Sequence, residues 1–360
     1  MVKDMTEEFG NILTRFRNQY GDKALESPRL VKIHPLTSAA ETVKRALRLP
    51  TAVIRSIKHD GVHATGKNVI KKLSHNILIR KSLRNTRNNK YNSILRSLRI
   101  VKSPEVKLAI VVHLYYPEMW PILEERLHNI NVPFDLYISV QDRDKHISID
   151  KIDTYHQATY IIPLPNRGRD VLPFLVITRL LRYNKYEYLL KLHSKKSPHR
   201  SDGDEWMKGL LDELVPSDIS RIIKTLDRIS TGSIGPASHV VSLSRYMGDN
   251  RNAIETIVTQ ISTRGVAEQV LANPSRYPFF GGTMFWCRLD YLEPLLNSDL
   301  TPDDFNSEQG QIDGTTAHAI ERILGKTLHE ISNKKMYCVR KGKTEVLPNK
   351  SFLAKYKYVD

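Results

Sequence analysis

An alternation of strand-like and helix-like segments that begins at Val106 constrains the fold more than any other feature. Residues 106–113 (VKLAIVVH) form a continuous apolar run, which is typical of a parallel strand buried on both faces of a sheet. Residues 117–130 then show the spacing of an amphipathic helix. Repetition of this order predicts an α/β fold with a mostly parallel sheet and right-handed crossovers.

The same patterns predict the elements that follow. Further strands are expected at 134–140, 160–164, 186–192 and 232–235. Helices are expected at 171–182, 206–215 and 218–229, followed by a helical and irregular segment at 238–273.

Two basic segments follow predicted strands. Pro165-Asn-Arg-Gly-Arg-Asp170 follows the apolar run 158–164, and Leu190-Lys-Leu-His-Ser-Lys-Lys-Ser197 follows the apolar run 186–190. Open α/β sheets bind ligands just beyond the carboxyl ends of their strands. Cations clustered at two such ends predict a crevice that binds a phosphorylated ligand. The alternative is that each segment is a basic surface turn.

The net charge of +16 is unevenly distributed. Residues 1–100 contain 21 Lys and Arg against 7 Asp and Glu, a balance of +14, whereas the other 260 residues contain 34 against 32, a balance of +2. This shift predicts a basic, mostly helical N-terminal region (1–105), a nearly neutral domain (106–340) and a basic C-terminal tail (341–360).

The basic N-terminal region has apolar residues at helical spacing over 37–100, with Lys and Arg between them. Such helices bind an anionic membrane surface, where each cation contributes on the order of 1 kcal/mol. A solvated linker and a helical hairpin docked on the domain are the alternatives. Nucleic-acid binding is not expected, because no aromatic stacking motif accompanies the charge.

Cysteine usage and hydropathy indicate the compartment. Cys287 and Cys338 lack the spacing of a metal site, as expected for a reduced cytoplasmic protein. Residues 1–20 lack the pattern of a secretory signal, and the sequence has no run of about eighteen apolar residues. We therefore expect a cytoplasmic protein whose membrane contact is peripheral, on the inner face of the plasma membrane.

An aromatic segment, Phe279-Phe-Gly-Gly-Thr-Met-Phe-Trp-Cys-Arg288, is predicted to form a turn and then a strand. Gly281 and Gly282 allow a ligand to approach the backbone closely. Trp286 belongs to an aromatic wall against which a sugar ring can stack, and core packing is the alternative.

Two carboxylates lie in the segment 308–322. Asp313 is expected at the N-cap of a helix, with His318 and Arg322 one and two turns onward, and Glu308 lies five residues earlier. Asp313 is therefore either a helix cap alone or, with Glu308, part of a crevice that contains a general base.

Five motifs occur in order: His113-Leu-Tyr-Tyr-Pro117, Asn166-Arg-Gly-Arg-Asp170, Lys191-Leu-His-Ser-Lys-Lys-Ser197, Gly281-Gly-Thr-Met-Phe-Trp286 and Asp313-Gly-Thr-Thr-Ala-His-Ala-Ile-Glu-Arg322. Together they resemble the rhamnan synthesis protein F family of bacterial glycosyltransferases, over roughly residues 106–335. The N-terminal hundred residues fall outside this resemblance.

The resemblance implies a GT-A type fold, with a Rossmann-like sheet and the donor at the strand carboxyl ends. It also implies transfer of a sugar, expected to be rhamnose, from a nucleotide-sugar donor such as dTDP-rhamnose. The acceptor is expected to be a lipid-linked or polysaccharide chain of rhamnan, O-antigen or capsule. The expected substrate-binding residues are His113, Asn166, Arg167, Arg169, Asp170, Lys191, His193, Lys195, Lys196, Gly281, Gly282, Trp286, His318 and Arg322.

The chain departs from the usual GT-A pattern after the fourth strand, where an Asp-x-Asp commonly holds a divalent cation. The segment Lys191-Leu-His-Ser-Lys-Lys offers cations there, and metal ions need oxygen ligands. Asp142-Arg-Asp144 follows the second strand, and we interpret it as a polar loop, with a metal role as the alternative. No metal cofactor is therefore expected.

The expected reaction is an inverting single displacement in which Asp313 or Glu308 deprotonates the acceptor hydroxyl. The departing diphosphate is neutralised by protein cations, namely Arg167, Arg169, His193, Lys195 and Lys196.

Two other classes of function remain open. A non-catalytic module that binds glycan or phosphate in polysaccharide assembly keeps the basic crevice but needs no carboxylate base. A phosphotransferase needs a phosphate-binding glycine loop, and the sequence contains no Gly-x-x-x-x-Gly-Lys-Ser or Gly-x-x-x-x-Gly-Lys-Thr segment.

Overall fold

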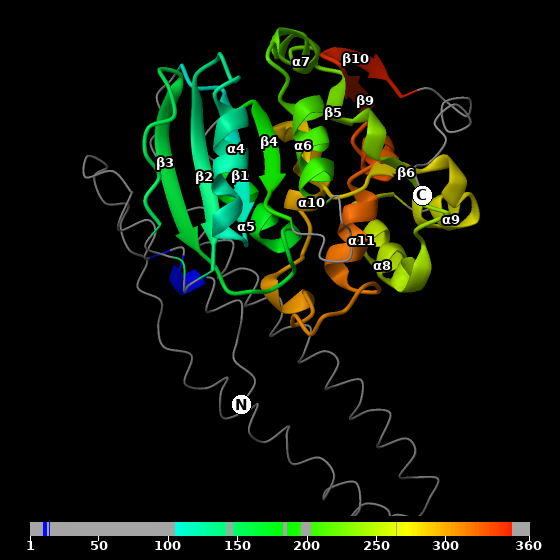
Figure 1. The fold of residues 1–360 in the computed structure, drawn as a ribbon. Helices are drawn as coiled ribbons and strands as arrows, with labels where there is room; N and C mark the ends of the chain where they lie inside the picture. The colour runs from blue at the N-terminus through cyan, green and yellow to red at the C-terminus, as the bar shows by residue number, and fades with distance from the viewer. Residues whose placement is uncertain are drawn as a thin grey trace, which may run out of the picture. The chain divides into compact units, whose positions relative to one another are not determined.

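An eight-stranded sheet forms the centre of the fold (Figure 1). The computed structural model describes residues 10–12, 14, 105–141, 144, 147–182, 186–195, 203–263 and 265–347. The sheet contains β1 (Leu108–Leu114), β2 (Phe134–Val140), β3 (His156–Pro163), β4 (Tyr188–His193), β5 (Thr231–Pro236), β8 (Phe285–Arg288), β9 (Lys335–Arg340) and β10 (Lys343–Val346). The helices predicted at 37–100, together with Asp142 and Lys196, lie outside the described residues.

The strand order is β10-β9-β5-β8-β4-β1-β2-β3. β1 pairs in parallel with β2 and β4, β2 with β3, and β5 with β9, whereas β8 is antiparallel to both β4 and β5. All strands of this sheet except β8 and β10 therefore run in one direction. The order 3-2-1-4 matches the first four strands of the Rossmann order 3-2-1-4-5-6, and the predicted mostly parallel α/β arrangement is confirmed.

The helices predicted at 117–130, 171–182, 206–215 and 218–229 are present, and further helices follow them. They are α4 (Trp120–Leu127), α5 (Val171–Leu181), α6 (Gly203–Leu214), α7 (Ser220–Leu226), α8 (Arg251–Ile261), α9 (Val266–Ala272), α10 (Glu293–Leu296), α11 (Thr316–Ile323) and α12 (Lys326–Ile331). Single 3₁₀ turns lie at Pro117–Met119, Ala237–His239, Gly248–Asn250, Pro274–Arg276, Leu289–Leu292 and Pro302–Asp304. The predicted irregular segment also contributes β6 (Val240–Ser242), which pairs with β7 (Pro278–Phe280) in a small second sheet.

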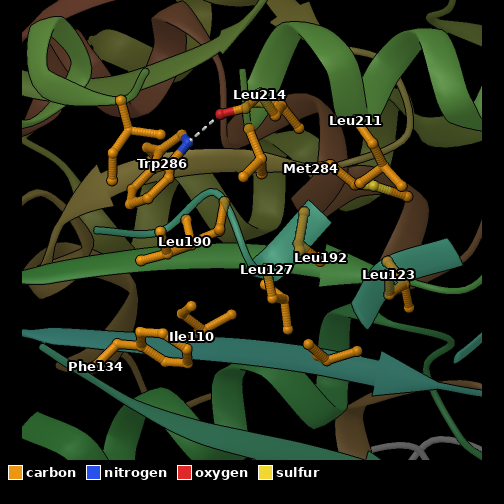
Figure 2. Close-up of a cluster of buried hydrophobic side chains, with 14 of the residues drawn as sticks. Ile110, Leu123, Leu127, Phe134, Leu190, Leu192, Leu211, Leu214, Met284 and Trp286 are labelled. Atoms are coloured by element: carbon orange, nitrogen blue, oxygen red, sulfur yellow. Dashed lines mark hydrogen bonds between the residues drawn. The ribbon is translucent and has the colours of Figure 1, made fainter. Parts of the chain in front are cut away.

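The main hydrophobic core lies between one face of the sheet and helices α4 and α6, as Figure 2 shows. Leu127 of α4 and Leu214 of α6 contribute to it, with Leu190 from β4. Trp286 of β8 is fully buried there, and its indole N–H donates to the Leu214 carbonyl at 2.8 Å. The predicted sugar-stacking role of Trp286 is therefore wrong, and the core-packing alternative is correct.

The opposite face of the sheet is covered by α5, whose residues are all buried. Successive strand residues point to opposite faces, so Lys191 lies on the face opposite its neighbours Leu190 and Leu192. Its ammonium nitrogen is 5.4 Å from the ring centroid of Phe174 on α5. This packing brings the start of α5, and with it Asp170, to the carboxyl end of β4.

Candidate functional site

A cavity of about 570 Å³ lies at the carboxyl ends of β1 and β4. Because β2 flanks β1 on one side and β4 flanks it on the other, this is the topological switch point at which open α/β sheets bind ligands. We call it the strand-end cavity. Of the predicted site residues, the structure brings together His113, Asn166, Arg169, Asp170, His193, Lys195, Gly282, Glu308 and His318.

Below this cavity, Lys191 forms an ion pair with Asp170. The Lys191 ammonium also donates to the carbonyl and the hydroxyl of Thr283, at 2.8 and 3.1 Å, and the Thr283 hydroxyl donates to Asp170 at 2.5 Å. Burial alone raises the pKa of Asp170, but the charge and hydrogen bond of Lys191 outweigh it and hold the pKa well below its usual range. Only Asp170 of this pair lines the cavity, so Lys191 acts as the partner of Asp170.

Burial lowers the pKa of all three histidines of the strand-end cavity. Burial lowers the pKa of His113 to about 4, and burial together with the charges of Arg169 and Arg322 lowers the pKa of His318 to about 4. Burial also lowers the pKa of His193, whose Nε2–H donates to the Gly282 carbonyl at 2.6 Å. Its Nδ1 lies 3.2 Å from the Ser194 carbonyl, so both ring nitrogens of His193 face backbone oxygens.

Two turns with consecutive left-handed residues border the cavity. Gly168 and Arg169 have φ of 66° and 54°, and Gly282 and Thr283 have φ of 86° and 49°. A non-glycine residue at positive φ is strained, and such strain concentrates at functional sites. The Gly282 backbone makes two hydrogen bonds here, because its carbonyl accepts from His193 and its N–H donates to Glu321 at 2.9 Å.

The predicted cations separate into three groups. Arg169 and Lys195 line the strand-end cavity. Arg167 does not, and its Nε–H donates to the Phe305 carbonyl at 2.8 Å. Lys196 lies outside the described residues. Where side chains are described, the cavity therefore has two cationic groups, beside the carboxylates of Asp170, Glu308 and Glu321.

Asp313 is not the N-cap of α11, in contrast to the sequence prediction. Thr315 is the cap, and its hydroxyl accepts from the His318 N–H. The Asp313 carboxylate pairs with Arg322 at 3.0 Å and accepts hydrogen bonds from Asn250 and from the Asp249 backbone. These partners outweigh burial and lower its pKa. Asp313 lines neither large cavity in this part of the chain, so the two predicted carboxylates do not converge on the crevice.

Glu308 does line the strand-end cavity, where it faces the Gly168–Arg169 turn. Its carboxylate accepts from the Arg169 backbone N–H at 3.1 Å, and its second oxygen is 3.9 Å from the Arg169 Nε. The role of Glu308 as a base stays a prediction.

A second cavity, of about 770 Å³, adjoins the first. We call it the adjoining cavity. The two share Arg169, Lys195, Gly282, His318 and Glu321. The predicted residues Gly281 and Arg322 line the adjoining cavity alone.

Glu321 is the residue that sequence reasoning missed. Burial and the nearby Asp170 raise the pKa of its carboxyl group. A signal was present, because residues three and four apart share a helix face. Glu321 and Arg322 follow His318 at these spacings, between the apolar residues Ile320 and Ile323.

Among the residues that the structure describes, no helix is long and apolar enough to cross a bilayer. Nor do three or more His, Cys, Asp or Glu side chains gather there in an arrangement that could hold a metal ion.

Comparisons with known proteins extend the resemblance. The family described as "Rhamnan synthesis protein F" matches residues 3–331, so the basic N-terminal region lies within the matched range, in contrast to the sequence analysis. The chain is also 33% identical over 219 residues to "Uncharacterized protein WxcX" of Xanthomonas campestris pv. campestris, in two strains. That alignment covers 60% of this chain and only 30% of the relative.

Proposed function

Because the chain belongs to the rhamnan synthesis protein F family, we propose that it is a glycosyltransferase of GT-A type that extends a rhamnose-containing cell-surface polysaccharide. The observation that carries the proposal is the cavity at the switch point between β1 and β4. The donor is a nucleotide-diphosphate sugar, with dTDP-rhamnose the first to test. The acceptor is a lipid-linked or polysaccharide chain.

The donor diphosphate binds beside Arg169 and Lys195, the two cations of the strand-end cavity. Arginine binds phosphate oxygens through paired N–H groups, and lysine binds them as a point charge. His113, whose pKa burial lowers to about 4, adds a hydrogen-bonding group without charge. Asp170, fixed by Lys191 and Thr283, is placed to accept hydrogen bonds from sugar hydroxyls.

The proposed reaction is a single displacement with inversion. An acceptor oxygen attacks the anomeric carbon while the bond from that carbon to the phosphate oxygen breaks, and its electron pair leaves with the diphosphate. Arg169 and Lys195 neutralise the charge that develops. A carboxylate accepts the proton of the acceptor hydroxyl.

Donor binding is tested with the purified full chain and a panel of nucleotide sugars, by thermal shift. A ligand at 100 times its Kd stabilises a protein by about 2.7 kcal/mol. We expect a nucleotide-diphosphate sugar to raise Tm and to be consumed when a rhamnan oligosaccharide is added. Stabilisation without turnover would instead favour a non-catalytic binding module.

The cation assignment is tested by Arg169→Ala combined with Lys195→Ala. Each charge-assisted hydrogen bond contributes about 1.5–3 kcal/mol, so donor affinity should fall roughly a hundredfold or more. Lys335→Ala with Arg340→Ala removes two exposed cations at β9 and should leave donor affinity unchanged. Donor binding should also persist in excess chelator. Loss of donor binding in chelator, with restoration by added magnesium, would contradict the assignment.

A further inference from the structure

The adjoining cavity has the mixed lining that a sugar ring requires. Glu213, Ser238 and His239 contribute polar groups to the lining, and Val241 and Tyr246 contribute apolar atoms. The Glu213 carboxylate is held in place by hydrogen bonds from the Ser238 N–H and hydroxyl, at 3.0 and 2.9 Å. Pyranose rings present hydroxyl groups around their edge and C–H groups on their faces, so they match such a lining.

Two exposed apolar side chains also line this cavity. Tyr246 is 42% exposed and Ile312 is 92% exposed, and both belong to the small set of large hydrophobic residues that the described surface leaves uncovered. The Tyr246 ring packs edge-on against Phe279, with ring centroids 6.1 Å apart. An exposed aromatic ring with a fixed neighbour offers a flat apolar surface to a ligand at low entropic cost.

Glu321 lines both cavities. One of its carboxylate oxygens accepts from the Gly282 N–H at 2.9 Å, and the other is 3.6 Å from Arg322. The side chain retains 22% exposure. A group that takes a proton from one substrate while that substrate attacks another must contact the space of both.

We propose that the adjoining cavity binds the acceptor saccharide and that Glu321 is the base that deprotonates its attacking hydroxyl. The inference rests on the proposed function for the donor side only. As the acceptor oxygen bonds to the anomeric carbon, its proton passes to the Glu321 carboxylate, and the bond to the departing diphosphate breaks with both electrons. Glu321 is then neutral, and it returns its proton to solvent when the products leave.

The first test measures saccharide binding alone. A soluble rhamnan oligosaccharide is titrated into the full chain without donor, and its affinity is measured by calorimetry. Tyr246→Ala and Ile312→Ser should each weaken binding by roughly tenfold. Tyr155→Ala and Ile229→Ser remove side chains that are 41% and 77% exposed and line neither cavity, so they should leave affinity unchanged.

The second test separates Glu321 from the other carboxylates. Glu321→Gln keeps an oxygen that accepts from Gly282, so the fold and donor affinity should be retained. Transfer to the oligosaccharide should fall by roughly a hundredfold to ten-thousandfold. Glu330→Gln removes a carboxylate on α12 that lines neither cavity, and its transfer rate should match that of the native chain.

The outcomes are distinguishable. An oligosaccharide that fails to bind, or that binds Tyr246→Ala as tightly as the native chain, would overturn the acceptor site. Near-normal transfer by Glu321→Gln would overturn the base. A native chain that binds the oligosaccharide through Tyr246 but binds no nucleotide sugar would support the saccharide site and count against the donor function.

Discussion

Lys191 is buried beneath the strand-end cavity, 1% exposed, and its ammonium group is paired with the carboxylate of Asp170. The pair joins the middle of the sheet to the start of α5, and Thr283 completes it with hydrogen bonds to both groups. Because a buried charge is costly without its partner, each residue depends on the other. The cation that the sequence assigned to substrate therefore positions Asp170 at the cavity.

Lys191→Ala should lower the free energy of unfolding by about 3–5 kcal/mol, because it leaves the Asp170 carboxylate unpaired. The measurement is urea unfolding at pH 7. Lys107→Ala is the matched control, since it removes the surface pair with Glu187 and should cost only about 0–1 kcal/mol. Equal losses in the two variants would contradict the buried pairing.

Gly168→Ala should destabilise the protein by about 2–4 kcal/mol, through both backbone strain and overpacking. A Cβ atom at this position would lie 2.5 Å from the Leu172 Cβ and 2.6 Å from a ring carbon of Phe305. Gly265→Ala isolates the backbone contribution, because Gly265 also has positive φ but a Cβ atom there would meet no other atom within 4 Å. Its cost should be about 1 kcal/mol, and a larger loss there than at Gly168 would refute the packing account.

His329 should make the protein less stable as the pH falls. Burial lowers its folded pKa to about 3, its Nδ1–H donates to the Gly325 carbonyl at 2.7 Å, and its Nε2 accepts from the Ser233 N–H at 3.1 Å. The unfolded chain therefore binds the proton first, below about pH 6.5, and the His329 contribution to stability falls by about 2 kcal/mol between pH 7 and pH 5.

Unfolding experiments at several pH values check the His329 prediction. His329→Gln should be less stable than the native chain at pH 7, with a difference that shrinks toward pH 5. His128, which is exposed, provides the control variant His128→Gln. An unchanged pH dependence in His329→Gln would show that other groups cause the acid destabilisation.

Membrane attachment by the basic N-terminal region remains a prediction from charge. Replacing Lys67, Lys71, Lys72 and Lys81 by Gln should weaken binding to phosphatidylserine vesicles by about 1 kcal/mol per residue. Moderate salt should weaken binding of the native chain, because it screens the attraction. Cosedimentation measures both effects, with neutral phosphatidylcholine vesicles as the control. Salt-independent binding would count against an electrostatic attachment.

Local patterns predicted six of the eight strands of the central sheet, but not β9 and β10, and β10 lies in the segment expected to be a basic tail. β2 spans Phe134–Val140, as expected, because its apolar run has clear ends. β3 begins at His156, four residues before its predicted start, because polar groups there are satisfied by partners that the sequence does not reveal. The His156 ring accepts from the Ile152 N–H at 3.1 Å and contacts the Thr159 hydroxyl at 2.7 Å.

The site was less predictable, because its decisive contacts join distant segments. Asp313 and Thr315 are both good helix caps by residue type. Asp313 is recruited instead by Asn250, 63 residues away, which frees the cap position for Thr315. Glu321 was missed for a similar reason, since its partner Gly282 lies 39 residues away.

β8 enters the sheet at the edge where β4 and β5 end, so one short stretch serves both the cavity and the core. Thr283, in the turn before β8, and Trp286, within β8, are only three residues apart in the chain. We therefore expect a change in volume at Trp286 to shift the Gly282 backbone, whose carbonyl accepts from His193 and whose N–H donates to Glu321. Substitutions within residues 282–286 should therefore change the melting temperature and the transfer rate together, so neither property can be tuned there without the other.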